Sequence, residues 1–189
     1  MRVTPGVIPE VLVIEPDVYR DPRGFLFESF HARRYESSGI RGPFVQDNHS
    51  LSAGGTLRGL HLQLGDPQAK LVRVLSGEIC DVAADVRVGS PTFGQWVAVR
   101  LSAENFLQMY VPAGFAHGFC VLSETAQVEY KCTAFYNPAG EIGIAWNDPE
   151  LAIDWPVKSP LLSERDAALP AVAQIRDRLP RFEVITSGR

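Results

Sequence analysis

Short apolar runs recur along most of this chain and predict β-strands. Residues 96–101 are rich in aromatic and β-branched side chains, which is typical of a strand in a packed sheet. Similar runs cover residues 11–15, 25–30, 44–45, 57–62, 71–75, 79–86, 106–111, 115–122 and 127–135. Only residues 31–38 and 171–179 have a pattern that favours helices.

Turn-forming residues separate these runs, at 53–55, 64–67, 76–77, 89–91 and 137–140. Many short strands joined by Gly and Pro turns, without alternating helices, predict a mainly β sandwich or barrel, with a jelly roll as the best candidate. The chain has 189 residues and no internal repeat or linker, so we expect one domain over 1–189 with a helical segment at about 163–180. Residues 183–189 are expected to form a frayed tail.

Composition narrows the class of partner. A net charge of −4 argues against nucleic acid or an anionic membrane, although a local group of arginines can still hold a small anion. The chain has no run of the roughly 20 apolar residues that span a bilayer. Cys80, Cys120 and Cys132 are odd in number and form no CxxC pair, which predicts buried thiols in a reducing compartment. We therefore expect a cytoplasmic protein.

Two stretches fit the metal-binding motifs of cupins, a jelly-roll superfamily, except at the ligand positions. His61 and His117 stand where two histidine ligands are usual. Gln63, however, replaces a further histidine, and Lys70 stands near the position of the acidic ligand. An ammonium repels a divalent cation, and an amide is a poor ligand for the metals that histidine favours. The pattern therefore predicts a site without a metal.

In such a site His61 is the candidate general base, because imidazole titrates near neutral pH. Lys70 could stabilise an oxyanion, and Tyr130 could act as an acid from another strand. Each assignment has a structural alternative: Arg58 and Lys70 as solvated charges, Tyr130 as a core aromatic. Arg58 lies three residues before His61, so the two need not share a strand face unless the strand bends.

Asp166 has two possible roles. Ser163 reads as a helix N-cap with Asp166 as its N3 partner, which would make the acid structural. Alternatively, the carboxylate orients His61 and stabilises its imidazolium form. Both roles are compatible if this helix begins beside the mouth of the barrel.

An ordered set of motifs closely resembles the dTDP-4-dehydrorhamnose 3,5-epimerases, metal-free members of the cupin superfamily. The set extends over nearly the whole chain, at residues 21–25, 44–50, 57–63, 70–73, 90–96, 111–119, 130–131 and 146–148. The resemblance implies a cupin jelly roll and a substrate that is a dTDP-linked 4-keto-6-deoxy sugar, with no cofactor. It implies that His61 is the base, Asp166 its partner, Tyr130 the acid and Lys70 the group that stabilises the enolate.

The resemblance also implies a set of substrate-binding residues. Arginine suits the diphosphate because its planar fork donates two parallel hydrogen bonds. Phe27 and Tyr136 could stack on the thymine or line the barrel wall. Arg165 stands where relatives often have lysine, and Phe135 where many have a second tyrosine. The implied binding residues are Arg23, Phe27, Glu28, Gln46, Asp47, Asn48, Arg58, His117, Tyr136, Glu141 and Arg165.

Several hypotheses stay open at this point. The leading one is epimerisation at both C3 and C5, followed by epimerisation at only one of these centres and by a sugar-nucleotide 3,4-ketoisomerase. A non-catalytic sugar-binding or storage cupin would not need a matched acid and base. The resemblance further implies a homodimer with exchanged N-terminal strands, in which Arg23, Phe27 and Glu28 serve the partner subunit's site.

Overall fold

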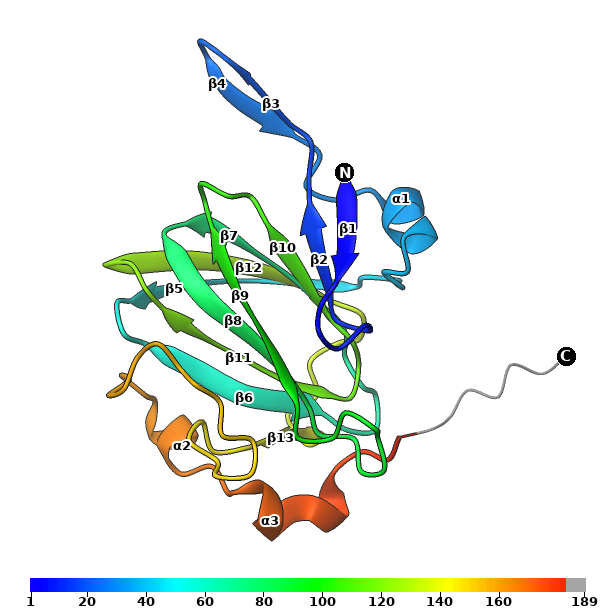
Figure 1. Ribbon diagram of the computed structural model, residues 1–189, viewed down its shortest axis with the longest axis vertical. Coiled ribbons are helices and arrows are strands. Elements are labelled where there is room, and N and C mark those ends of the chain that lie inside the picture. The colour runs from blue at the N-terminus through cyan, green and yellow to red at the C-terminus, as the bar shows by residue number, and fades with distance from the viewer. Residues whose placement is uncertain (183–189) are drawn as a thin grey trace, which may run out of the picture.

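Two antiparallel β-sheets face each other in a computed structural model that describes residues 1–182 (Figure 1). The tail expected at 183–189 lies outside the described residues. The six-stranded sheet consists, in spatial order, of β1 (Arg2–Pro5), β2 (Leu12–Glu15), β10 (Gln108–Val111), β7 (Lys70–Ser76), β12 (Thr125–Cys132) and β5 (Gln46–Ala53). The five-stranded sheet consists of β13 (Glu141–Gly143), β6 (Leu57–Gln63), β11 (Phe115–Val121), β8 (Glu78–Asp85) and β9 (Trp96–Ser102). The predicted mainly β jelly roll is confirmed.

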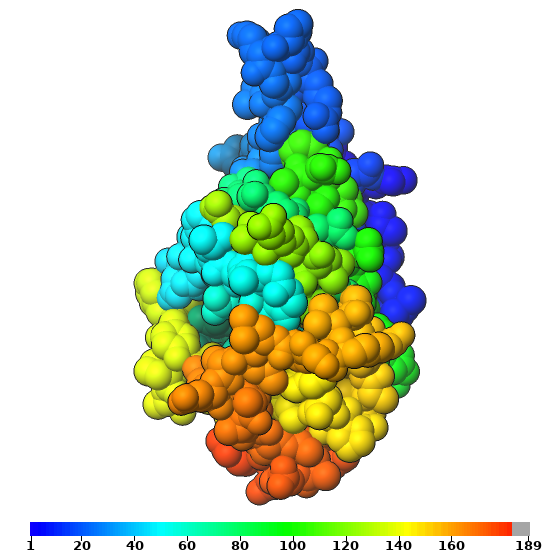
Figure 2. Space-filling model, turned by 90° about the vertical axis from the view of Figure 1, so that its left-hand side faces the viewer, coloured from blue at the N-terminus to red at the C-terminus, as the bar shows by residue number. Residues whose placement is uncertain are grey.

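A separate hairpin, β3 (Val18–Asp21) and β4 (Gly24–Phe27), projects from one end of the sandwich as a narrow arm (Figures 1 and 2). Phe25 and Phe27 pack edge-on against Phe106, with ring centroids 4.8 and 5.2 Å apart. Leu26 is 73% exposed. The strand predicted at 25–30 ends at Phe27. The helix predicted at 31–38 is α1 (Ala32–Ser37).

Apolar side chains fill the space between the sheets and also cover their outer faces. The inner core joins Val72 and Val128 of the six-stranded sheet to Ala83 and Phe119 of the five-stranded sheet. Tyr35 of α1 packs on the outer face of the six-stranded sheet. Because residues alternate between faces along a strand, both faces of these central strands are buried.

The C-terminal segment covers the outer face of the five-stranded sheet, seen below it in Figure 1. It consists of α2 (Glu164–Ala167), α3 (Val172–Ile175) and the 3₁₀ turn η1 (Arg176–Arg178). The helix predicted at 171–179 is therefore only one α turn continued by a 3₁₀ turn. The predicted N-cap is confirmed, since the backbone N–H of Asp166 donates to Ser163 Oγ at 3.0 Å.

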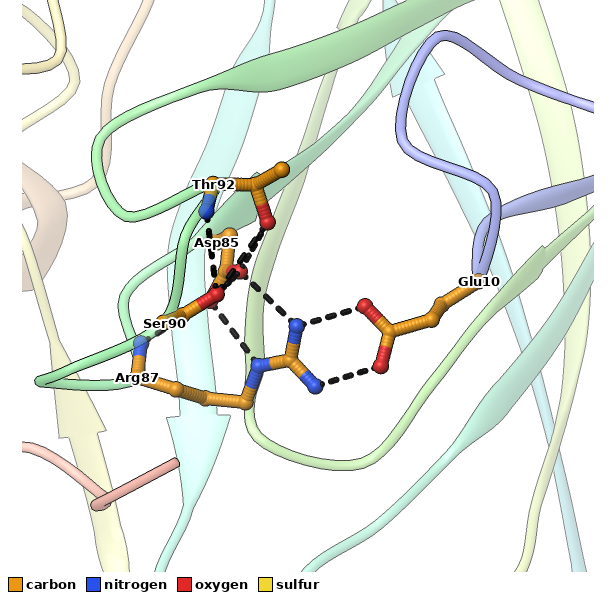
Figure 3. Close-up of polar contacts among 5 residues, drawn as sticks. All are labelled: Glu10, Asp85, Arg87, Ser90 and Thr92. Atoms are coloured by element: carbon orange, nitrogen blue, oxygen red, sulfur yellow. Dashed lines mark hydrogen bonds and ion pairs between the residues drawn. The ribbon is translucent and has the colours of Figure 1, made fainter. Parts of the chain in front are cut away.

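A polar cluster fastens the loop before β2 to the turn after β8 (Figure 3). Arg87 donates to both carboxylate oxygens of Glu10, at 2.8 and 2.7 Å, and also to Asp85. Ser90 and Thr92 donate their hydroxyls to Asp85 Oδ2 at 2.5 and 2.6 Å. Burial alone would raise the pKa of Asp85, but these donors outweigh it and hold that pKa below its usual range. The Asp85 carboxylate therefore has hydrogen-bond donors, and the cluster has a structural role in holding the two segments together.

Candidate active site

A cavity of about 260 Å³ opens between the two sheets, and many of the predicted site residues line it. The base candidate His61 comes from the five-stranded sheet, whereas Lys70 and Tyr130 come from the six-stranded sheet. Asp166 reaches the cavity from α2. The complete lining is Ser50, Arg58, His61, Lys70, His117, Phe119, Tyr130, Ser163, Arg165 and Asp166.

An irregularity in β6 brings Arg58 and His61 to the same cavity. His61 pairs with His117 of β11, but Arg58 pairs with Phe119, so two residues of β6 between these pairs oppose one of β11. Gly59 lies at this irregularity with φ of +120°, and a Cβ there would approach Gly118 Cα to 2.6 Å. Only glycine fits so close to a neighbouring backbone. The bend that the spacing of Arg58 and His61 requires is therefore present.

His61 and Asp166 form a closely bonded pair. His61 Nε2 lies 2.7 Å from Asp166 Oδ1, and the side chains are 23% and 6% exposed. Burial by itself would raise the pKa of Asp166, but the hydrogen bond and charge of His61, with the Gly59 backbone and Ser163, lower it. An ionised carboxylate only accepts hydrogen bonds, so Nε2 carries the proton and Nδ1 is left as the basic nitrogen of His61.

Lys70 and Tyr130 are neighbours on the opposite sheet. Lys70 Nζ lies 5.6 Å from the centroid of the Tyr130 ring. Burial lowers the pKa of Lys70 and raises the pKa of Tyr130. The phenol is therefore protonated at neutral pH and available as an acid, with the Lys70 amine beside its ring.

His117 has its own carboxylate partner. His117 Nε2 lies 2.8 Å from Asp81 Oδ1, and both side chains are almost fully buried. Burial lowers the pKa of His117, although the charge and hydrogen bond of Asp81 oppose that shift. The His117 ring also lies edge-on to Tyr130, with centroids 6.5 Å apart. His117 thus lines the cavity as a neutral imidazole.

Glu141, Tyr136 and Arg165 form a polar cluster at the edge of the cavity. The Tyr136 hydroxyl donates to Glu141 Oε2 at 2.9 Å, and Arg165 forms an ion pair with the same oxygen. Burial would raise the pKa of Glu141, but Arg165 and Tyr136 outweigh it and lower it. The Tyr136 backbone N–H also donates to Gln46 Oε1 at 2.8 Å, which joins the cluster to β5.

Gln63, at one of the altered ligand positions, is committed to a structural role. Its amide nitrogen donates to the carbonyl oxygens of Asp66 and Phe135, and its amide oxygen accepts from the backbone N–H of Asn137. Among residues 1–182, His, Cys, Asp and Glu side chains form no group of three or more that could hold a metal ion. The donor set of this site therefore does not suit a metal.

Three predicted binding residues lie away from the cavity within one chain. Arg23, Phe27 and Glu28 belong to the β3–β4 hairpin or directly follow it (Figure 1). Arg23 pairs with Asp21, and Glu28 pairs with Arg34. Asp47 faces outward from β5 and pairs with Lys131, whereas Gln46 and Asn48 are half-buried on the same strand and bond each other.

Sequence reasoning missed Ser50, Asp81 and Phe119. Ser50 and Phe119 line the cavity directly, and Asp81 bonds His117. Ser50 stands in the recognised stretch 44–50, two residues beyond Asn48, so strand alternation could have placed it on the same face. The three thiols are buried and free, as predicted. No helix within residues 1–182 is long and apolar enough to cross a membrane.

Comparison with known proteins identifies the family of this chain. A family model described as dTDP-4-dehydrorhamnose 3,5-epimerase matches residues 5–174. A protein of that description from Pseudomonas aeruginosa is 59% identical over 168 residues, which are 88% of this chain and 93% of the relative.

Solved structures with the same fold include two that hold sugar nucleotides. That of dTDP-6-deoxy-D-glucose-3,5-epimerase from Legionella pneumophila in complex with dTDP-4-keto-L-rhamnose has a TM-score of 0.94 and 52% identity, and covers 97% of this chain and 99% of its own. A 3'-monoepimerase from Streptomyces bikiniensis in complex with dTDP-quinovose has a TM-score of 0.88 and 36% identity, with coverage of 94% and 92%.

Proposed function

Because the chain belongs to the dTDP-4-dehydrorhamnose 3,5-epimerase family, we propose that it converts dTDP-4-dehydro-6-deoxy-D-glucose to dTDP-4-dehydro-L-rhamnose by inverting C3 and C5. The observation that carries this function is the placement of an acid opposite a base. His61 lies on one sheet and Tyr130 on the other, and both line one cavity. A sugar ring between the sheets would therefore present opposite faces to the two groups.

The 4-keto group makes the neighbouring hydrogens acidic. In the gluco configuration the hydrogens on C3 and C5 project from the same face of the ring, so one base can reach both in turn. His61 Nδ1 takes the proton, and the C–H electron pair moves to the carbonyl to give an enolate. Asp166, at 2.7 Å from Nε2, stabilises the imidazolium that forms.

Reprotonation from the other face completes the inversion. The Tyr130 O–H bond breaks as its proton adds to the carbon, and the enolate electron pair forms the new C–H bond. Lys70 supplies positive charge on the same side for the enolate oxygen. His61 then releases its proton to solvent and Tyr130 regains one. Only protons move, so the reaction has no need of an electron acceptor, and no cofactor is expected.

The nucleotide would occupy the polar edge of the cavity. Arg58 and Arg165 line the cavity and suit a diphosphate, because a guanidinium donates paired hydrogen bonds to phosphate. Tyr136 is 50% exposed, so its ring is available to stack on thymine. The further predicted contacts are Gln46, Asp47, Asn48, His117 and Glu141. A cytoplasmic location also stays a prediction.

We further propose a homodimer in which the β3–β4 hairpin of one subunit completes the other subunit's site. The hairpin exposes Tyr19, Phe25 and Leu26, with 68%, 56% and 73% of their surface accessible. Such apolar exposure on a projecting arm is typical of an interface. Docking the arm on a second barrel would bring Arg23, Phe27 and Glu28 to the nucleotide, which they do not reach in their own chain.

Mixing two inactive variants tests this exchange. If Arg23 acts in the neighbouring site, an Arg23→Ala subunit paired with a His61→Ala subunit contains one site with both defects and one intact site. Activity should then return after subunit exchange, which native mass spectrometry of differently tagged chains can verify. Exchanged but inactive heterodimers would contradict the proposal.

Solvent isotope incorporation tests the reaction itself. The protein should catalyse deuterium incorporation from heavy water at C3 and C5 of dTDP-4-dehydro-6-deoxy-D-glucose, read by position with NMR. Label at only one carbon would instead identify a single-centre epimerase, as the similarity to the 3'-monoepimerase allows. Binding of the substrate without any exchange would exclude both reactions.

A further inference from the structure

The inner face of β5 carries a row of four polar side chains, Gln46, Asn48, Ser50 and Ser52, at every second position. Directly opposed residues of an antiparallel pair point to the same side, so the register of β5 with β12 places this row beside the acid candidate. Asn48 pairs with Tyr130, and Ser50 pairs with Val128, the next inward position of β12. Ser50 is therefore a diagonal neighbour of Tyr130.

Three members of the row have partners within the chain. Gln46 donates to Asn48 Oδ1 at 3.1 Å, and Asn48 donates to Cys132 Sγ at 3.6 Å. Ser52 Oγ accepts from Arg58 Nε at 2.9 Å. Ser50 differs: its Oγ is buried and has no hydrogen-bond partner among the residues that the structure describes.

An unpaired buried hydroxyl is unusual, because folding strips it of water and returns no hydrogen bond. The structure around Ser50 does not require a hydroxyl, since its neighbour across the ladder is the apolar Val128. Ser50 does, however, line the cavity together with His61, Lys70 and Tyr130. These are the groups that the proposed function places around the hexose.

We propose that the Ser50 hydroxyl is a substrate contact that hydrogen-bonds the hexose on the Tyr130 side of the ring. A hydroxyl both donates and accepts, as the hydroxyl groups of a sugar do. The contact would help to hold the carbon that is being reprotonated in line with the phenol. This inference rests on the proposed function and adds to it a residue that determines recognition of the sugar.

Ser50→Ala separates this role from a structural one. It removes a hydroxyl that has no partner among residues 1–182, so thermal stability should stay unchanged or rise. The kcat/KM for the epimerisation should fall on the order of 10-fold, the loss of about one hydrogen bond. Affinity for dTDP alone, measured by calorimetry, should stay unchanged because dTDP lacks the hexose.

Ser90→Ala is the matched control. The Ser90 hydroxyl is also buried, but it donates to Asp85 in the cluster of Figure 3, outside the cavity. This variant should lose thermal stability and keep kcat/KM. The two serines should therefore show opposite effects.

Three results would overturn the inference: wild-type kcat/KM in Ser50→Ala, an equal loss of affinity for dTDP, or a fall in stability like that of Ser90→Ala. If the wild-type protein shows no epimerisation, the proposed function fails separately. Calorimetry of the sugar nucleotide against dTDP then still tests the Ser50 contact.

Discussion

Replacing Asp166 by asparagine tests whether the carboxylate serves His61 beyond holding the fold. The α2 cap uses the backbone N–H of Asp166, so the substitution leaves that bond to Ser163 intact. The ring keeps its position and tautomer where the amide oxygen faces His61 Nε2, and the loss is larger where the amide nitrogen faces it. What disappears is the negative charge that stabilises the imidazolium formed during proton abstraction.

The magnitude follows from the 2.7 Å contact and the low exposure of Asp166. A hydrogen bond between charged groups contributes at least about 1.5 kcal/mol. Two unit charges about 4 Å apart at an effective dielectric constant of about 20 interact by about 4 kcal/mol, which is an upper bound for a partly exposed His61. We therefore expect proton exchange to slow by about 10- to 1,000-fold, at 1.36 kcal/mol for each factor of ten.

The assay is deuterium incorporation at saturating substrate, with dTDP affinity as the control for an intact site.

The contribution of Asp166 to the free energy of unfolding should also depend on pH. Because the folded state lowers the pKa of Asp166, its contribution is present above the carboxyl's unfolded value and is lost as pH falls through the folded value. The stability gap between wild type and Asp166→Asn should therefore close in acid. Exchange at the wild-type rate would refute the role of the carboxylate.

Three further predictions concern the same cavity. His61→Ala should abolish exchange and leave dTDP binding largely intact, and surviving exchange would remove His61 from the base role. Burial lowers the pKa of Lys70, so activity should fall as alkaline pH deprotonates this cation. Lys70→Met should lower kcat and abolish this fall in activity at alkaline pH. An unchanged alkaline pH dependence would contradict the assignment. Gly59→Ala should disturb β6 and lower both activity and melting temperature, because its Cβ would lie 2.6 Å from Gly118 Cα, whereas Gly55→Ala, with no atom that close, should be milder.

Much of the architecture could be predicted because its strands are apolar on at least one face. The strands that escaped prediction are β1, β3, β13 and β5; for β5 only 44–45 was predicted, but the strand is Gln46–Ala53. Its half-buried or buried inward positions, Gln46, Asn48, Ser50 and Ser52, are polar, so hydrophobic periodicity conceals it. One of the missed strands therefore supplies a residue of the cavity, Ser50.

Local sequence left the role of Asp166 open, and in the structure its backbone and its side chain have different partners. Its backbone completes the cap, while its side chain meets His61, 105 residues earlier in the chain. No local pattern encodes such a separation; the family resemblance supplied it. Asp81 was missed for the same reason, since its contact with His117 depends on the register of β8 against β11.

The central claim is that base and acid act on opposite faces of the sugar, and Tyr130→Phe in heavy water tests it most directly. This variant keeps His61, Lys70 and the aromatic ring but lacks the phenolic proton. The account predicts that His61 still removes and returns protons on its own face, so deuterium enters at C3 and C5 with retained configuration and little inverted product forms. Inverted product at the wild-type rate would contradict the account.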